Sequence, residues 1–524
     1  MAAVHCTFIL LIVCFAVANT EPPPSTIGSD GKPLRGAALR AKTNEEYDRL
    51  NGLASDHFQK LADFINANKD RLNAKKNRVP GAPEIEPFTV KPPEFPSISE
   101  INTKLGLEQV YLESDEYFPI QQLKERFGLE DPIQQTTPSS RRKRQTMVDL
   151  QYPTDTWTQG VPYFFDPSLS TSGVAAVQTA IGFWQTYTCV RFTQVSSPSA
   201  STIKPVVRFY NGSGCNSPVG RLTDPSYVTQ DVSIGTTCDT PAIASHEIGH
   251  TLGMYHGQQR ADRDWWISVN TSNINPSYVF AFNEANSSTN YNYGMRYDLR
   301  SIMHYTPYSG FAINQSAPVM NAYDWLAQYS MGASRMPVFT DITLINYEYK
   351  CYDRCNASGT VCYHGGMPNP NNCAVCQCPS GFAGKDCSYI EPSNGVVGSC
   401  GGLLTPTAIW TDLKVTNQIG NGVWAGSAVQ ANCTWHILAP AGKFVQFYVQ
   451  SVGAGGSNST HCSSNCYWAG VDIKWDSNKQ PEGYRICCPD SYYWMNQSKD
   501  NLLIVQAYNY WYYTDFTLSY RIAP

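Results

Sequence analysis

The cysteines of this chain are distributed very unevenly, and this distribution constrains the fold more than any other feature. Two of the eighteen, Cys6 and Cys14, lie near the N-terminus, and the next one is Cys189. The other sixteen are an even number, which in a secreted protein predicts eight disulfides. We therefore expect a cysteine-free N-terminal region followed by a disulfide-bonded one.

The N-terminus predicts a secreted, extracellular protein. Residues 8–17 are almost wholly apolar, and residues 16–18 have the small-x-small pattern read by signal peptidase. The run is shorter than the ~18 residues that a membrane span needs, so we expect residues 1–20 to be a cleaved signal peptide and not an anchor. No later segment is long and apolar enough to predict a membrane span. Eight Asn-x-Ser/Thr sites are glycosylation candidates of the same compartment: Asn211, Asn270, Asn286, Asn314, Asn356, Asn432, Asn458 and Asn496.

Length and charge narrow the possibilities further. A chain of 524 residues is too long for one core, so several domains are expected. A formal net charge of -5 gives no electrostatic reason to expect a nucleic-acid partner.

The region from residue 21 to residue 144 contains no cysteine and ends in a dense basic run, Arg141-Arg142-Lys143-Arg144. In a secretory chain, at the junction with a cysteine-bearing region, we interpret this run as the cleavage site of a furin-type processing protease. The alternative is a solvated charged patch. Cleavage after Arg144 would leave Gln145 as the mature N-terminus and make residues 21–144 a propeptide.

An eleven-residue stretch, His-Glu-Ile-Gly-His-Thr-Leu-Gly-Met-Tyr-His, predicts a metal site. His246 and His250 are four residues apart, so on a helix they point to the same side and one metal ion can take both. Glu247 lies beside the metal without ligating it, where it can take a proton from water. Gly253 can end the helix, because glycine tolerates a left-handed turn, and the chain can then return His256 to the metal. Three histidines leave one position open, which is typical of a catalytic zinc.

Periodicity predicts regular elements before this stretch. Val174, Val177, Ile181 and Trp184 fit one face of a helix that starts near Ser172. Residues 190–192 and 206–210 have strand-like patterns.

A second motif, Ser-Ile-Met-His-Tyr at residues 301–305, is short and apolar. After the extended zinc motif it looks like the Met-turn of the metzincins. The chain continues after the third histidine as Gly-Gln-Gln-Arg-Ala-Asp-Arg-Asp, and together these motifs resemble the astacin family. The resemblance implies that residues 145–351 form an astacin-like α+β metalloprotease domain. Further matches are Val161-Pro-Tyr163, Thr188-Cys189-Val-Arg-Phe192, Gly214-Cys215-Asn-Ser-Pro-Val-Gly220-Arg221 and Cys238.

The resemblance also implies a role for each site residue. It implies that the three motif histidines bind one zinc ion and that Glu247 is the general base. It implies that Tyr305 is a further ligand that swings away to stabilise the oxyanion, and that Met303 forms the apolar floor under the metal. The implied function is an endopeptidase that acts on extracellular protein substrates. The alternative is a matrix or adhesion protein that uses the domain only as a binding scaffold, but every ligand and Glu247 are present, which favours the enzyme.

Substrate binding and latency have their own candidates. We expect an extended substrate peptide to pair with an edge strand at residues 231–234. Astacin propeptides carry a Phe-x-Gly-Asp latch whose nearest match here is Leu-Glu-Ser-Asp at residues 112–115, so Asp115 is the candidate latch. The alternative is a solvated acidic turn. Astacins usually carry Glu after the third histidine, where it receives the mature N-terminus. Gly257 stands there instead, and Gln145 can cyclise, so a charged N-terminal lock is not expected.

The C-terminal third predicts two smaller modules. Six cysteines lie within residues 355–387, a segment too short to fold without disulfides, and its end resembles the closing signature of epidermal-growth-factor-like (EGF-like) modules. Residues 352–390 are therefore the expected EGF-like module. Residues 400–522 are rich in Tyr, Trp, Val and Gly with frequent turn signals, which predicts an all-β sandwich. Its Cys-Gly-Gly-Leu-Leu and Cys-Thr-Trp-His-Ile stretches resemble the opening of a CUB domain. Both modules are expected to make protein contacts.

The arrangement of modules resembles that of many nematode astacins, which act on cuticle or eggshell, and by analogy suggests cuticle or matrix processing.

Spacing alone leaves fifteen disulfide connectivities open in the small module. Cys462, Cys466, Cys487 and Cys488 would form two further bridges whose pairing stays open. The resemblances imply the pairs Cys189–Cys351, Cys215–Cys238, Cys355–Cys373, Cys362–Cys376, Cys378–Cys387 and Cys400–Cys433.

Overall fold

A computed structural model describes residues 98, 101–102, 116–117, 144–147 and 155–524, except residues 286–289, 309, 356–359, 424–425, 455–460 and 464. The expected signal peptide, Asp115 and the sequons at Asn286, Asn356 and Asn458 lie outside the described residues. Over the described part of the chain, no helix is long and apolar enough to cross a membrane.

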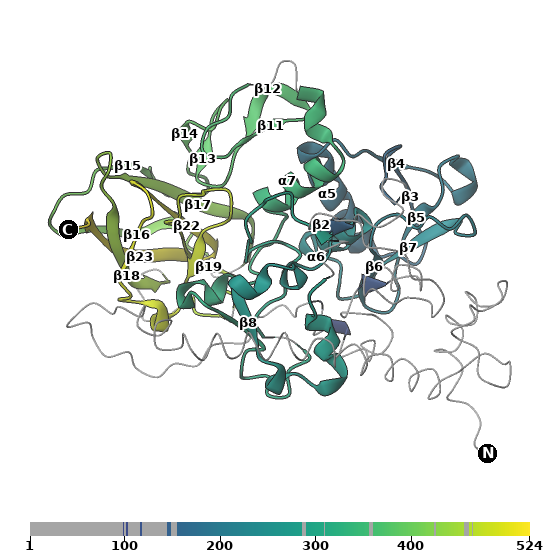
Figure 1. The fold of residues 1–524 in the computed structure, drawn as a ribbon, viewed down its shortest axis with the longest axis horizontal. Helices are drawn as coiled ribbons and strands as arrows, with labels where there is room; N and C mark the ends of the chain where they lie inside the picture. Colours follow the sequence, from purple (N-terminus) through teal and green to yellow (C-terminus); the bar gives the residue numbers. More distant parts are fainter. Residues whose placement is uncertain are drawn as a thin grey trace, which may run out of the picture. The chain divides into compact units, whose positions relative to one another are not determined.

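The region before the metal motif folds around a six-stranded sheet with the order β1-β6-β7-β5-β3-β4 (Figure 1). Strand β6 (Cys215–Pro218) runs antiparallel to its neighbour β7. On its other side it pairs in parallel with β1 (Glu116–Tyr117), which comes from the N-terminal region. The four parallel strands are β3 (Val161–Phe165), β4 (Phe192–Gln194), β5 (Val206–Tyr210) and β7 (Thr229–Ile234).

The prediction that residues 231–234 form an edge strand is wrong. They belong to β7, which is hydrogen-bonded on one side to β5 and on the other to β6. A turn at Gly214, whose φ is +70°, brings the chain back so that Cys215 lies opposite Ile234. The sequence of β6, Cys-Asn-Ser-Pro, contains none of the β-branched or aromatic residues that mark strands. Among the strands that follow the expected cleavage site, β6 is therefore the outermost on this side of the sheet, and β1 of the N-terminal region pairs with it.

Helix α5 (Thr171–Tyr187) confirms the predicted helix near Ser172. The Ser170 hydroxyl accepts a hydrogen bond from the Gly173 amide at 2.9 Å and so caps its first turn. Val177, Ile181 and Trp184 are buried on one face, as their spacing predicts. The predicted strand at residues 206–210 is β5, whereas the one at 190–192 starts later, as β4.

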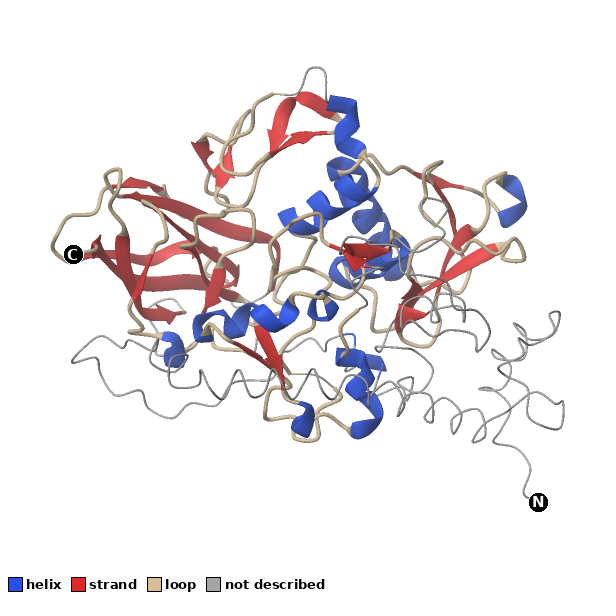
Figure 2. Cartoon of the chain, in the orientation of Figure 1, coloured by secondary structure: helices blue, strands red, loops and turns tan. Residues whose placement is uncertain are grey.

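Helix α6 (Pro241–Thr251) carries the first two motif histidines and packs against α5 (Figure 2). Proline in its first turn is favourable, because that amide needs no partner within the helix. Every residue of α6 from Ala244 onwards is buried. The third long helix, α7 (Phe339–Glu348), follows the Met-turn region.

Between and around these helices the chain forms short elements. The short strands are β2 (Arg144–Met147), β8 (Ile267–Val269), β9 (Asn290–Tyr291) and β10 (Met320–Ala322), paired as β2 with β9 and β8 with β10. The 3-10 helices are η2 (Pro198–Ala200), η3 (Gly257–Gln259), η4 (Arg263–Trp265), η5 (Thr271–Asn273), η6 (Pro276–Phe282), η7 (Trp325–Ser330), η8 (Cys351–Cys355) and η9 (Pro489–Ser491).

The cysteine-rich segment contains two small hairpins, and the residues after it form two packed sheets. The sheets have the orders β15-β17-β22-β19-β20 and β16-β23-β18-β21, and enclose an apolar core that includes Trp435, Phe447 and Leu518. We call the residues from β15 to β23 the C-terminal sandwich. The hairpin strands are β11 (Met367–Asn369), β12 (Asn372–Gln377), β13 (Phe382–Ala383) and β14 (Tyr389–Ile390). The sandwich strands are β15 (Gly402–Leu404), β16 (Thr411–Gly420), β17 (Gly426–Leu438), β18 (Val445–Gly453), β19 (Ala469–Lys474), β20 (Tyr484–Ile486), β21 (Asn496–Gln497), β22 (Leu502–Trp511) and β23 (Tyr513–Ile522).

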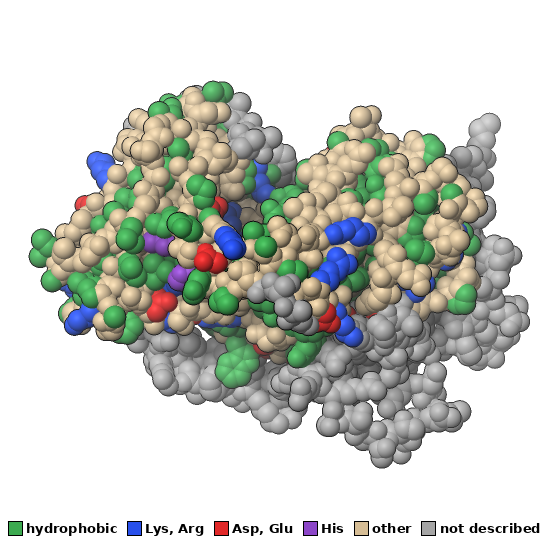
Figure 3. All heavy atoms as spheres, turned by 90° about the horizontal axis from the view of Figure 1, so that it is seen from above, with side chains coloured by type: hydrophobic (Ala, Val, Ile, Leu, Met, Phe, Trp, Pro, Cys, Tyr) green, Lys and Arg blue, Asp and Glu red, His purple; other side chains and the backbone are tan. Residues whose placement is uncertain are grey.

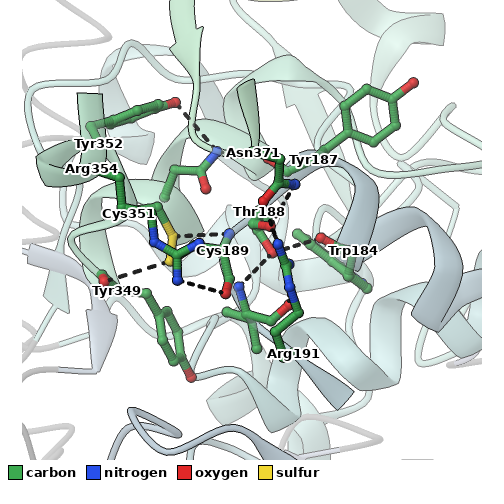
Figure 4. The surroundings of a disulfide bond; sticks show 12 residues. Trp184, Tyr187, Thr188, Cys189, Arg191, Tyr349, Cys351, Tyr352, Arg354 and Asn371 are labelled. Atoms are coloured by element: carbon green, nitrogen blue, oxygen red, sulfur yellow. Dashed lines mark hydrogen bonds between the residues drawn. A yellow bond between two sulfur atoms is a disulfide. The ribbon is translucent and has the colours of Figure 1, made fainter. Parts of the chain in front are cut away.

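The disulfides include all six pairs that the resemblances imply. The four remaining cysteines pair as Cys462–Cys488 and Cys466–Cys487. Figure 4 shows how Cys189–Cys351 ties the end of α5 to the segment after α7. The six expected pairs are Cys189–Cys351, Cys215–Cys238, Cys355–Cys373, Cys362–Cys376, Cys378–Cys387 and Cys400–Cys433.

Charged side chains of the described residues are dispersed over the face drawn in Figure 3. Lysine and arginine lie singly or in small groups among acidic, polar and apolar side chains. This mixture accords with the small net charge of the whole chain, -5.

Candidate metal centre

Three histidine nitrogens converge in the interior. Helix α6 places the rings of His246 and His250 on one face, with their Nε2 atoms 3.0 Å apart. The Nε2 atom of His256 lies 3.3 Å from that of His246. The helix ends before His256 because Gly253 adopts a φ of +101°, which reverses the chain as the sequence predicts. Tetrahedral zinc with Zn–N bonds of about 2.0–2.1 Å separates its ligand atoms by about 3.3 Å, so the three nitrogens fit that ion.

Hydrogen bonds on the outer ring nitrogens fix two of these imidazoles. The Nδ1 atom of His246 donates to the Ile302 carbonyl at 2.7 Å. The Nδ1 atom of His250 donates to the Met254 carbonyl at 2.9 Å. With the proton on Nδ1, each Nε2 atom presents a lone pair to the centre, which is the tautomer that a metal ligand needs.

Glu247 and Tyr305 lie around this centre from different elements. Glu247 is wholly buried and follows His246 directly on α6. The Tyr305 ring is stacked at a tilt against His256, with ring centroids 4.5 Å apart. Its backbone amide donates to the Gln258 side chain at 3.0 Å, which fixes the tyrosine beside the third histidine. The structure therefore brings together the residues that the sequence marks as ligands, base and oxyanion stabiliser.

Met303 packs directly on α6 at Gly249, the residue before His250. It is wholly buried, and a Cβ atom added to Gly249 would lie 2.7 Å from its Sδ atom. Glycine therefore lets the helix approach the Met303 side chain this closely without displacing it. The Met303 carbonyl accepts a hydrogen bond from the Gly257 amide at 2.7 Å, which ties the Met-turn to the segment after the third histidine.

The residue after the third histidine is also tightly packed. A Cβ atom on Gly257 would lie 3.1 Å from the Cβ and Cδ2 atoms of His304. Burial lowers the pKa of His304 to about 4, so its ring is neutral at physiological pH. Its Nδ1 atom donates to the Tyr305 carbonyl at 2.7 Å, and its Nε2 atom accepts from the Tyr297 hydroxyl at 2.7 Å. His304 thus occupies the space beside Gly257.

Sequence reasoning missed the residues that hold the Met-turn. Asp341 accepts hydrogen bonds from the Ser301 hydroxyl at 2.5 Å and from the Ile302 amide at 2.9 Å. It also accepts from the Val338 amide at 2.9 Å, which is the pattern of an N3 residue that caps its own helix. Gly332, at a φ of +61°, leaves space beside Tyr305 that a side chain would fill. The capping position of Asp341 is a signal that the sequence offered; Gly332 offered none.

The expected cleavage site and five of the eight sequons lie within the described residues. Arg144 and Gln145 belong to β2, whose backbone pairs with β9. Among the sequons, Asn211 and Asn314 are exposed, whereas Asn270, Asn432 and Asn496 are half-buried. The Asn432 side-chain nitrogen donates to the Glu391 carboxylate at 3.2 Å.

Comparison with known proteins identifies the family. The family model described as Astacin, a peptidase family, matches residues 149–350. Zinc metalloproteinase nas-31 of Caenorhabditis elegans is 34% identical over 456 residues, which are 86% of this chain and 70% of that protein. Zinc metalloproteinase nas-29 of the same nematode is 33% identical over 353 residues, which are 67% of this chain and 62% of that protein.

Among solved structures, the hatching enzyme zinc-protease HCE-1 of Oryzias latipes is similar at 26% identity with a TM-score of 0.33, over 42% of this chain and 99% of that chain. The sequence matches show the family. They cover most of this chain and include all three converging histidines, whose spacing fits one zinc ion. This chain therefore belongs to the astacin family of zinc metalloendopeptidases.

Proposed function

We propose that this chain is a secreted endopeptidase, made as a zymogen, that hydrolyses extracellular protein substrates. The observation that carries the proposal is the convergence of three histidine Nε2 atoms with buried Glu247 and Tyr305 at one centre. The rival function, a binding scaffold without activity, would leave this arrangement without a use.

The chain's own residues would divide the chemistry between them. Bound zinc supplies Lewis acidity, which polarises the scissile carbonyl and lowers the pKa of water. Glu247 takes a proton from the attacking water and later gives it to the leaving amine. The Tyr305 hydroxyl donates a hydrogen bond to the oxygen on which negative charge develops. Burial of Glu247 keeps bulk water from competing with these transfers.

An extended substrate would pair with the edge strand β6. In the described part of the chain its outer side pairs with β1 of the N-terminal region. The Asn102 side chain binds the first residue of β6. Its amide nitrogen donates to the Cys215 carbonyl at 2.7 Å, and its oxygen accepts from the Cys215 amide at 2.9 Å. The N-terminal region thus holds the backbone groups that a substrate peptide would use, which supports a zymogen.

Asp115 is the proposed latch on the zinc position. In the sequence it directly precedes β1, and β1 pairs with β6, the strand that is proposed to hold the substrate, which supports this proposal. Release would follow cleavage between Arg144 and Gln145 by a furin-type protease. We further propose that the EGF-like module and a CUB-like sandwich contact extracellular proteins, and that the substrates belong to cuticle or matrix.

Hydrolysis of casein or denatured collagen by the mature protein tests the activity. Glu247→Ala should lower kcat by at least about 1000-fold, because it removes the base, while bound zinc measured by atomic absorption stays at one ion per chain. Wild-type protein that is no faster than this variant would favour the scaffold.

The uncleaved proform tests the zymogen. Asn102→Ala removes both hydrogen bonds to Cys215 and should raise proform activity several-fold, and Asp115→Ala should raise it further. Mature proteins obtained from both variants should have wild-type kcat, since neither residue remains after cleavage. Full latency of the double variant would contradict the proposal.

A further inference from the structure

A cluster of buried charges joins the C-terminal sandwich to the segment that leads into the Met-turn. Arg300 precedes the Met-turn directly, and its side chain lies against Asp472 of β19 and Glu482 of the β19–β20 loop. Arg485 of β20 and the buried Lys474 of β19 also belong to the cluster, and Asp298 lies beside it. The side chains of Arg300, Asp472, Glu482 and Arg485 are each less than 10% exposed. Charges this far from water require specific partners.

The contacts in this cluster are short and multiple. The Nη1 atom of Arg300 lies 2.6 Å from one Asp472 oxygen and 3.3 Å from a Glu482 oxygen. Arg485 binds both Asp472 oxygens, at 2.9 Å and 3.1 Å. The Asp298 carboxylate accepts from the Glu482 amide at 3.0 Å and from the Arg300 amide at 3.0 Å. Two residues of the segment before the Met-turn are thus fixed by the sandwich.

The same segment orients a metal ligand. Two residues after Arg300, the Ile302 carbonyl accepts the hydrogen bond from Nδ1 of His246 at 2.7 Å. The Ser301 amide donates to the Asp298 carbonyl at 3.2 Å, so the turn that carries Ile302 begins on the anchored pair. A displacement of Arg300 would therefore move the carbonyl that sets the tautomer and direction of the His246 ring.

We propose that Asp472 of the sandwich is a positioning residue for hydrolysis: it holds Arg300, and through it the Met-turn carbonyl that orients His246 toward zinc. The sandwich is then part of the support of the catalytic centre as well as a surface for protein contacts. Partners that orient metal ligands typically change metal affinity or activity about 10- to 100-fold when they are removed. Because well-packed apolar residues could replace a whole buried ion pair without loss of stability, the geometry that the pair fixes is the stronger reason for placing charges here.

The test uses the full mature chain with Asp472→Asn, which keeps the shape of the side chain but removes its charge. Asp490→Asn is the matched control, because Asp490 on η9 also contacts the region outside the sandwich, but its carboxylate accepts a hydrogen bond from Tyr329 on η7, at 2.9 Å. We expect Asp472→Asn to lower kcat about 10-fold with KM within about twofold, and to weaken zinc about 10-fold in competition with a chromophoric chelator. Asp490→Asn should leave each quantity within about twofold.

A spectrum separates positioning from general destabilisation. The visible bands of the cobalt-substituted protein report ligand geometry at the metal, and they should shift in Asp472→Asn but not in Asp490→Asn. Equal zinc affinity, kcat and cobalt spectra in the two variants would overturn the proposal.

Two milder variants keep the test open if Asp472→Asn does not fold. Arg300→Lys keeps the charge but loses the planar fork, and Glu482→Gln removes the second carboxylate from Arg300. Both should weaken zinc by a few-fold, and wild-type affinity in both would also overturn the proposal. Because zinc affinity needs no turnover, this inference, which rests on the proposed function only for its kinetic readout, can fail or stand separately from it.

Discussion

At the scale of single residues, Gly249 and Met303 are closely packed in the centre. Gly249→Ala places a Cβ atom 2.7 Å from the Met303 sulfur, so the wholly buried Met303 side chain must shift within its packed surroundings. We expect a loss of about 1–3 kcal/mol in unfolding free energy, the usual cost of overpacking, together with lower kcat. Gly182→Ala on α5 is the control, because its added Cβ would have no neighbour within 4 Å. Denaturant unfolding of both variants checks the prediction; equal midpoints would contradict it.

The site residues themselves could be predicted because their chemistry depends on local spacing. His246 and His250 share a helix face, and Gly253 sits where the chain must reverse to return His256. The supporting residues could not be predicted in the same way. Asp341 holds Ser301 from a distance of forty residues, and a contact of that kind leaves no periodic pattern in the sequence.

At the scale of elements, strand patterns predicted buried strands better than the edge. β5 is apolar and was predicted, whereas β6 has a polar sequence and was missed. The position of β6 is defined by the turn at Gly214 and by the disulfide from Cys215 to Cys238 more than by its own side chains. Since the substrate is proposed to pair with β6, the functional edge was the part of the sheet that propensity described least.

The end of helix α5 provides a prediction at this scale. Asn371, from the small module, donates to the carbonyl oxygens of Gln185, Thr186 and Thr188 at 2.9–3.1 Å. Figure 4 shows Asn371 beside Thr188. These carbonyls have no partner within the helix, so Asn371→Ala should lower the unfolding free energy by about 1–2 kcal/mol. The neighbouring Asn372→Ala, whose side chain accepts only from the Ala374 amide, should change it by less than about 0.5 kcal/mol. Thermal unfolding midpoints of the two variants test this prediction. A midpoint lower for Asn372→Ala than for Asn371→Ala would contradict the capping of α5 by Asn371.

At the scale of the whole molecule, the sequence separates regions that the structure joins. Cysteine spacing and composition predict a small module and a sandwich as additions to a catalytic domain. The structure instead packs Arg335 of the region before α7 between the rings of Tyr467 and Tyr510, each with its centroid 3.7 Å away. Arg485 also donates to the Ala333 carbonyl at 2.6 Å. Such contacts depend on shape and on charges distant in sequence, so composition alone does not reveal them.

The buried charges around Asp472 predict how the stability of the protein changes in acid. Burial alone would raise the pKa of Asp472, but Arg300 and Arg485 outweigh it and hold the pKa below its usual value. A carboxylate with a lowered folded pKa stabilises the protein above its unfolded pKa of about 4, and this contribution is lost as the pH falls through the folded value. At pH 7 we expect the unfolding free energy of Asp472→Asn to be about 3 kcal/mol lower than that of wild type. This difference in unfolding free energy should narrow progressively between pH 5 and pH 2, because only wild type loses the carboxylate charge at residue 472. Protonation of the zinc ligands affects both proteins. Midpoints followed by tryptophan fluorescence across this range test it, and a gap that stays constant would show that the charge of Asp472 does not stabilise the joined unit.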